Sequence, residues 1–210
     1  MPRPLNIVVS EDNFTHIQDM KRSSFFRLAL SAVTSLSLPF SSYARRRSAK
    51  RADKGFFVGA GKDRFDKSLS LFDGDTFYCK VSTKDTDGDI YMFESTRQKK
   101  GGPPLHLHYE QDEWWYVLQG EFLIKVGDQL YNAKAGDSVF GPRMVPHSFS
   151  KVSEEEAKML IFFSPAGKME ESFIARSKGV TNNMTDQQRQ EFSKVHGVEI
   201  VGPPLTLLKQ

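Results

Sequence analysis

Three histidines and one glutamate in the middle of the chain have the residue types and spacing of a metal site. His106 and His108 lie two residues apart, Glu113 follows five residues later, and His147 lies further along the chain. Side chains two apart on a β-strand point to the same face, so a strand through His-Leu-His presents both imidazoles together. Imidazole and carboxylate ligands without a thiolate suit divalent iron, manganese, nickel, cobalt, copper or zinc. We expect these four residues to bind one such ion, whose identity stays open.

The segments around the first three candidate ligands must bring their side chains together. Two prolines directly before Leu105 favour extended backbone, which predicts a strand carrying the two histidines. Polar residues after His108 predict a turn, and a new strand over residues 113–119 would then bring Glu113 back over the histidines. We expect residues 121–126 to return after Gly120 as the hairpin partner of that strand.

His147, the fourth candidate ligand, follows a second group of turn residues. Residues 132–137 predict a turn and residues 138–140 a short strand. Two prolines then restrict a loop, after which His147 would begin a strand over residues 147–152. This loop is expected to carry the third imidazole to the other ligands.

These two segments resemble the paired motifs of the cupin superfamily. The first motif is matched by His106, His108, Glu113 and Gly120, and the second by Gly136, Pro142 and His147. Lys100 and Met144 stand where the family pattern has glycine, and Lys151 stands where it has asparagine. None of the three is a ligand position, so the resemblance still implies metal binding by the four candidate ligands.

The resemblance implies an all-β fold, namely a single jelly-roll-like antiparallel β-barrel with short C-terminal helices. We place the barrel at residues 56–166, after an N-terminal extension over 1–55. Residues 167–210 would form a helical segment that packs on the barrel. In this segment Thr185-Asp-Gln-Gln188 has the layout of a capping box and predicts a helix as far as about His196.

The N-terminal extension has the layout of an export signal. A basic start at Met20, a short apolar run and small residues before position 45 predict a signal peptide over about residues 20–44, followed by a basic linker. The apolar run is too short for a stable membrane span. We therefore expect an exported or periplasmic protein, with a disordered basic tail and a cytoplasmic location as the alternative.

The charge of the chain argues against nucleic-acid binding, and its cysteine content excludes an intramolecular disulfide. The formal net charge is only +3, and much of the excess lies near the N-terminus, so the body of the chain is not expected to bind nucleic acid. Cys79 is the single cysteine, so no intramolecular disulfide can form, and it is expected to be a buried small hydrophobe. A small molecule is the expected partner.

The resemblance also implies two classes of function. The first is a mononuclear metal-dependent dioxygenase, similar to quercetinase-like cupins, acting on an aromatic or enolisable substrate. In that case Glu113 could act as general base, and Trp115 and Phe149 would line the substrate pocket. The alternatives are a non-catalytic ligand-binding or sensing module and a metal-dependent isomerase or lyase. Cupins are often homodimers, and the outward-facing Trp114 and Tyr116 are candidates for the subunit contact.

Overall fold

Several strands of this protein alternate between buried side chains and more exposed ones. In β10 (Ala157–Ser164) every second side chain is buried, and in β5 (Asp112–Gln119) Glu113, Trp115 and Val117 point inward. A strand with this period covers a core with one face and leaves the other exposed.

The structure is a computed structural model that describes residues 51–71 and 74–207, so the candidate signal peptide and the start of the basic linker lie outside the described residues.

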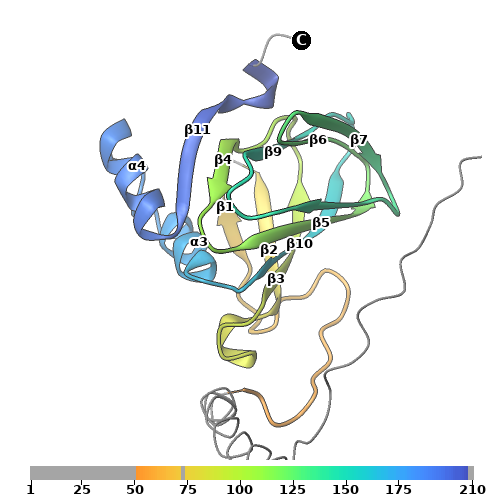
Figure 1. Cartoon of the computed structure of the whole chain (residues 1–210). Coiled ribbons are helices and arrows are strands. Elements are labelled where there is room, and N and C mark those ends of the chain that lie inside the picture. The colour runs from red at the N-terminus through yellow and green to blue at the C-terminus, as the bar shows by residue number, and fades with distance from the viewer. Residues whose placement is uncertain (1–50, 72–73, 208–210) are drawn as a thin grey trace, which may run out of the picture. The chain divides into compact units, whose positions relative to one another are not determined.

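Two antiparallel sheets face each other and form a barrel (Figure 1). The first sheet has the strand order β1 (Leu69–Leu71), β2 (Asp75–Val81), β3 (Tyr91–Arg97), β10, β5 and β8 (Ser138–Gly141). The second has the order β11 (Val198–Pro204), β4 (Pro104–His108), β9 (His147–Lys151), β6 (Glu121–Val126) and β7 (Gln129–Lys134). The predicted all-β barrel with short C-terminal helices is confirmed.

Aromatic side chains from the first sheet fill much of the space between the two sheets. The rings of Phe77 and Phe93 stack with centroids 4.3 Å apart, and Phe163 lies 6.4 Å from Phe93. Phe122 and Ile124 of β6 are also fully buried. Aromatic pairs at these separations add to the stability that burial alone provides.

The predicted hairpin between residues 113–119 and 121–126 is wrong. β5 pairs with β10 and β8, whereas β6 pairs with β7 and β9 in the opposite sheet. Gly120 has φ +76°, and an added Cβ would lie 2.7 Å from the Cβ of Ala157. Glycine is needed at this corner, where the chain leaves one sheet and enters the other.

The predicted turn over 132–137 also begins too early, because β7 continues to Lys134.

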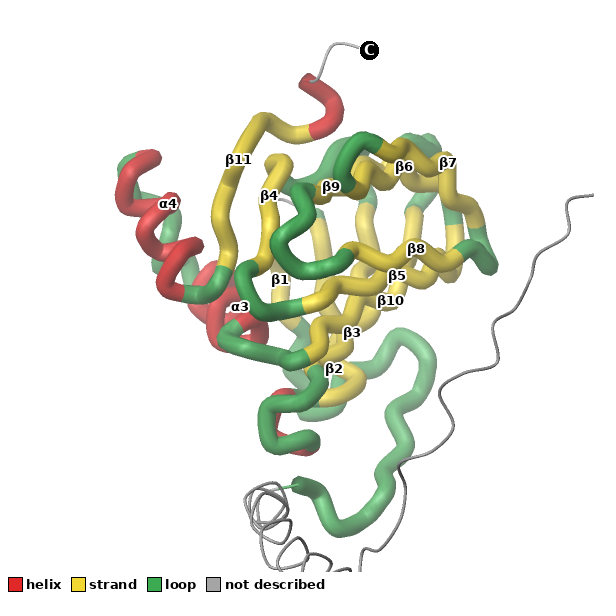
Figure 2. Tube along the Cα trace, in the orientation of Figure 1, coloured by secondary structure: helices red, strands yellow, loops and turns green. Residues whose placement is uncertain are grey.

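The C-terminal segment contributes helices and one further strand. Helix α3 (Met169–Ser177) and helix α4 (Asp186–Val195) lie at the side of the barrel that carries β11 (Figure 1 and Figure 2). The predicted capping box is present, since Thr185 and Gln188 exchange hydrogen bonds between side chain and backbone. Strand β11 then pairs with β4, so the second sheet includes a strand from the C-terminal segment. Within residues 51–71 and 74–207, no helix has the length and apolar character needed to cross a membrane.

Candidate metal centre

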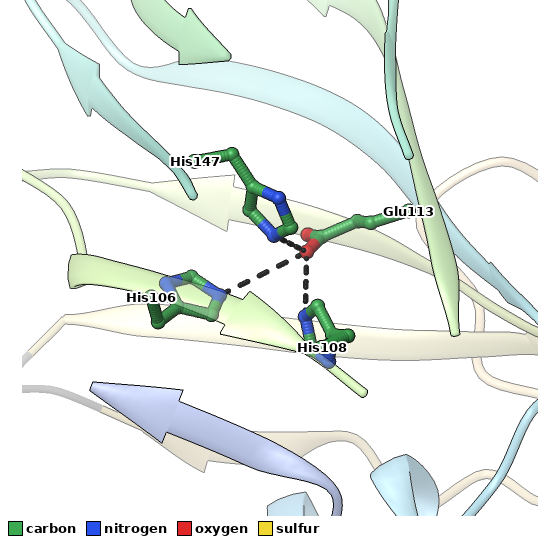
Figure 3. A group of neighbouring side chains, drawn as sticks. All are labelled: His106, His108, Glu113 and His147. Carbon is green, nitrogen blue, oxygen red and sulfur yellow. Dashed lines mark hydrogen bonds and ion pairs between the residues drawn. The ribbon is translucent and has the colours of Figure 1, made fainter. Parts of the chain in front are cut away.

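The barrel brings the four candidate ligands to one point in its interior (Figure 3). His106 and His108 lie on β4, and His106 is the cross-strand partner of His147 at the start of β9. Glu113 reaches the three imidazoles from β5 in the opposite sheet. One ligand atom from each residue lies within 4.8 Å of the others. The cluster can therefore hold a single metal ion.

All three imidazoles direct their Nε2 atoms at the same carboxylate oxygen. Oε2 of Glu113 lies 3.0 Å from Nε2 of His108, 3.1 Å from Nε2 of His147 and 3.9 Å from Nε2 of His106. Glu113, His108 and His147 are almost completely buried, whereas 13% of the His106 side chain is exposed. The group is thus closed to solvent on every side except that of His106.

Backbone carbonyls fix the tautomer of two of these histidines. Nδ1 of His106 lies 2.8 Å from the Pro104 carbonyl oxygen, and Nδ1 of His147 lies 2.9 Å from that of Val145. A carbonyl only accepts, so each Nδ1 must carry the proton and donate it. In the neutral ring, Nε2 is then unprotonated, and its lone pair points at the centre of the four candidate ligands. A metal-binding histidine has this tautomer and orientation.

This arrangement of acceptors fits a cation. Two Nε2 lone pairs and a carboxylate oxygen face one another in a buried space, and acceptors in such contact need a positive charge between them. Nδ1 of His108 is buried and has no hydrogen-bond partner among the described residues. The donor set, three imidazoles and one carboxylate, is one that divalent transition metals bind.

The electrostatics of the group favour deprotonated ligands. Burial, together with the neighbouring His147 and His108, lowers the pKa of His106 to about 3. Burial alone would raise the pKa of Glu113, but its close contacts with the His108 and His147 imidazoles hold that pKa well below its ordinary value. Metal ions bind neutral imidazole and ionised carboxylate, so these ligands are in the binding form at neutral pH.

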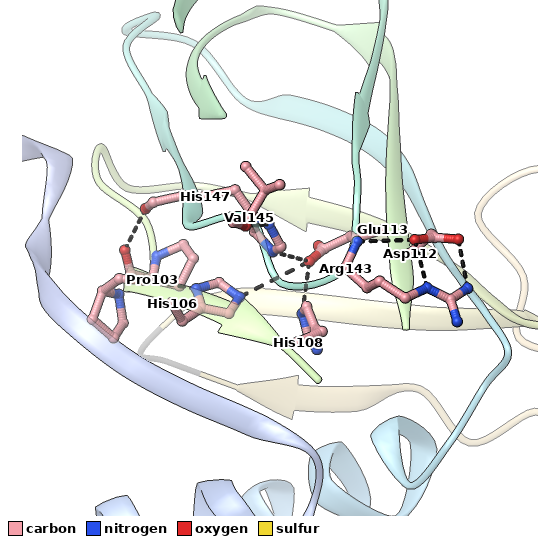
Figure 4. Close-up of polar contacts among 10 residues, drawn as sticks. Pro103, His106, His108, Asp112, Glu113, Arg143, Val145 and His147 are labelled. Atoms are coloured by element: carbon pink, nitrogen blue, oxygen red, sulfur yellow. Dashed lines mark hydrogen bonds and ion pairs between the residues drawn. The ribbon is translucent and has the colours of Figure 1, made fainter. Parts of the chain in front are cut away.

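An ion pair that the sequence did not indicate holds the loop before His147 (Figure 4). The Arg143 guanidinium forms two hydrogen bonds with Asp112, of 3.0 and 2.7 Å, and the Arg143 backbone N–H donates a third of 2.9 Å. Asp112 directly precedes Glu113, so the pair connects the ligand on β5 to the loop that delivers His147. Met144, at the motif's glycine position, has φ +63°, so the backbone keeps the conformation that favours glycine.

A cavity of about 240 Å³ adjoins the candidate ligands. Its walls include His106, His108 and Glu113, and the rest is mostly apolar, with phenylalanines at positions 77, 93, 149, 163 and 173. Phe149 therefore faces the cavity. Trp115 is not among the lining residues, since it is fully buried with its ring 5.3 Å from that of His147 and against Gly141. Trp115 therefore packs against the candidate ligand His147 and does not contact the cavity.

Comparison with known proteins agrees with this geometry. Residues 87–163 match the family model described as the cupin domain, and all four candidate ligands lie within the match. Residues 87–163, which include most of the barrel strands, are therefore a cupin domain.

Similarity to individual proteins is limited to part of the chain. An uncharacterised protein from Methanocaldococcus jannaschii is 29% identical over 70 residues, which make up 33% of this chain and 56% of that protein. The match thus spans just over half the length of that relative.

Several solved structures are also similar. KdgF from Halomonas sp. has a TM-score of 0.46 and 19% identity, covering 53% of this chain and 94% of that one. An RmlC-like cupin from Shewanella frigidimarina has a TM-score of 0.45 and 21% identity, covering 58% and 99%. The polyketide cyclase RemF from Streptomyces resistomycificus has a TM-score of 0.44 and 22% identity, covering 53% and 80%.

Proposed function

We propose that this protein is a mononuclear metal-dependent enzyme of the dioxygenase type, acting on a small aromatic or enolisable molecule. The observation that carries the proposal is the position of the ligand set at one end of a largely apolar cavity, with His106 as its exposed member. A bound transition metal would supply Lewis acidity and, for a redox-active ion, chemistry with dioxygen. His106, His108, Glu113 and His147 would hold it.

The residues around the cavity would orient the substrate and exclude water. Phe149, Phe163 and Phe173 offer aromatic surface to a planar substrate, and apolar walls with few polar groups are typical of small-molecule sites. The lowered pKa of Glu113 favours an ionised ligand over a strong proton acceptor. The role of general base is therefore the less favoured of its two proposed roles.

Elemental analysis and oxygen uptake together test this proposal. The full chain, purified without chelator, should contain about one transition-metal ion and consume oxygen when a flavonol or an enolisable diketone is added. His106→Ala should lose both properties. Oxygen consumption at the buffer rate with every such substrate, despite full metal content, would contradict the dioxygenase.

The second candidate function is a non-catalytic binding module, favoured by the near-complete enclosure of three of the four ligands. Such a module would bind an aromatic ligand with one-to-one stoichiometry and without turnover. Isothermal titration alongside the oxygen electrode separates the two functions, because an enzyme consumes the ligand during the titration.

We also propose that two copies of the chain associate through the outer face of the first sheet. Trp114, Tyr116 and Leu118 of β5 point outward there and are exposed, as is Phe140 of the edge strand β8. The Trp114 ring contacts those of Phe140 and Phe162, at 6.2 and 5.2 Å, so the aromatic residues form one surface. Contiguous exposed aromatic surface of this kind is typical of subunit contacts.

A further inference from the structure

One face of α3 forms a wall of the cavity. Ser172 and Phe173 lie three and four residues after Met169, and Arg176 lies three residues after Phe173, which places all four on the same side of the helix. All four line the cavity. Ser193 from α4 and Val198 and Ile200 from β11 complete this wall. The wall lies outside residues 87–163, so the cupin-domain match supplies the ligands and the C-terminal segment supplies this wall.

Two arginines line the cavity, and they differ in how their charge is balanced. Arg97 is buried and forms a 2.7 Å ion pair with Asp75, which is buried as well. For Arg176, no carboxylate within residues 51–71 and 74–207 lies at ion-pair distance. Among the charged residues of the cavity, Glu113 belongs to the ligand set and Arg97 has a partner, so Arg176 is the one whose charge no described carboxylate balances.

Neutral groups hold the Arg176 side chain in place. Its Nε donates to the Ser172 hydroxyl at 3.4 Å, one Nη donates to the Ser193 hydroxyl at 3.1 Å, and the guanidinium lies 5.1 Å from the centroid of the Phe192 ring. Burial lowers the pKa of Arg176, yet an arginine stays charged in a protein. The guanidinium has five N–H donors, so the two Nη groups retain donors for a further acceptor.

We propose that Arg176 binds a carboxylate of the small molecule that occupies the cavity, whose aromatic or apolar body lies against the phenylalanines. This assignment rests on the proposed function, in which the cavity is the substrate site. A carboxylate matches the planar pair of donors of a guanidinium and supplies the negative charge that no described residue places beside Arg176. Arg176 also lines a more open hollow at the surface together with Lys178 and Asn182, so it borders both spaces.

Paired probes that differ only in charge test the assignment. Benzoate and benzamide share the ring and nearly the same shape, and 3-phenylpropanoate and its amide repeat the comparison with a longer reach. Isothermal titration of the full wild-type chain should show tighter binding of each acid than of its amide. Arg176→Gln should weaken binding of the acid by about ten-fold or more, the usual loss for a charge-assisted hydrogen bond, and leave the amide unchanged.

Two controls separate this effect from loss of the fold and from binding to a metal. Arg189→Gln removes a half-buried arginine that pairs with Asp186 on the same helix and donates to the Thr181 carbonyl, and this variant should bind the acids as the wild type does. Repeating the titrations on chelator-treated protein removes any carboxylate–metal contact, and the difference between wild type and Arg176→Gln should persist. Arg176→Lys keeps the charge without the planar donors and should recover only part of the affinity.

The outcomes are distinct from those of the oxygen-uptake experiment, because titration measures binding without turnover. Equal or absent binding of acid and amide by the wild type would overturn the assignment, as would wild-type affinity in an Arg176→Gln variant of unchanged unfolding midpoint. A chain that consumes no oxygen but loses acid binding on Arg176→Gln would retain the carboxylate site and refute only the dioxygenase.

Discussion

At the scale of single residues, the main chain prepares the imidazoles for a metal. The Pro104 and Val145 carbonyls each accept from the Nδ1–H of the histidine two positions later, His106 and His147. The ring orientation therefore depends on two short pieces of backbone, not on neighbouring side chains. Side-chain substitutions near the site are expected to leave these tautomers unchanged.

Replacing His106 by alanine should remove the metal and leave the strands intact. His106 is the most exposed of the four candidate ligands, and its loss removes one of the three imidazoles that would hold the ion. Elemental analysis should fall from about one ion per chain to near zero, with the circular dichroism of the strands unchanged. His196→Ala is the matched control, because His196 lies outside the group and donates to the Phe192 carbonyl. Full metal content in His106→Ala would refute the ligand assignment.

The single cysteine should be inert in the native protein. Burial, followed by the charges of Glu170 and Asp63, raises the pKa of Cys79 to about 12. A raised pKa favours the neutral thiol, so at pH 8 only roughly one thiol in ten thousand is the reactive thiolate. A disulfide reagent at pH 8 should therefore label Cys79 only after denaturant is added. Rapid, stoichiometric labelling without denaturant would show that the thiol is accessible.

At the scale of elements, the sequence located strands more reliably than it paired them. The strands predicted over residues 113–119, 121–126 and 147–152 lie close to β5, β6 and β9, since burial of one face imposes an alternating period. The same period does not say which strand lies alongside, so the corner at Gly120 was interpreted as a hairpin.

The candidate site was predictable only in part. The spacing of the four ligands could be compared with a family pattern, whereas Arg143 and Arg176 have no recognisable local signal in the sequence. Asp112, the partner of Arg143, and Ser193, a partner of Arg176, lie on other elements of the chain. The cavity wall from α3 depends on where the C-terminal segment docks, and no short-range pattern of residues specifies this.

Loss of the Arg143–Asp112 pair should weaken metal binding without removing a ligand. Arg143→Ala frees the loop that delivers His147, and groups that orient ligands typically affect metal affinity by about ten- to hundred-fold. Competition with a chromophoric chelator measures the change. Arg189→Ala, which removes an exposed pair within one helix, should leave the affinity unaltered. Equal affinities for the two variants would show that the loop is held by other contacts.

The substitution Gly102→Ala should push the segment that leads into β4 away from β9 and lower the stability of the fold. An added Cβ would lie 1.7 Å from the carbonyl oxygen of Phe149, a backbone atom of β9 that cannot move without shifting the strand. Overpacking of this kind costs about 1–3 kcal/mol, so the unfolding midpoint should fall by several degrees, about 2–4 °C per kcal/mol. Gly55→Ala is the control, since nothing lies within 4 Å of a Cβ there. Equal midpoints in thermal denaturation would contradict the close contact.

At the scale of the whole molecule, the exposed aromatic surface predicts the oligomeric state. Tyr116→Glu places a charge in the proposed subunit contact and should convert the dimer to a monomer, because an unpaired charge in an apolar interface is costly. Light scattering after size-exclusion chromatography measures the mass. Tyr131 on β7 has nearly the same exposure, 42% against 44% for Tyr116, and Tyr131→Glu should stay dimeric. A wild-type monomer at all concentrations would refute the contact.

The pairing of β11 with β4 joins the recognition surface to the ligand strand. Val198 and Ile200 line the cavity, and their register partners on β4 are His108 and His106. A molecule that shifted this wall would also shift a ladder of hydrogen bonds that carries two of the four candidate ligands. Occupancy of the cavity would in this way affect the positions of His106 and His108, and β11 would transmit the effect.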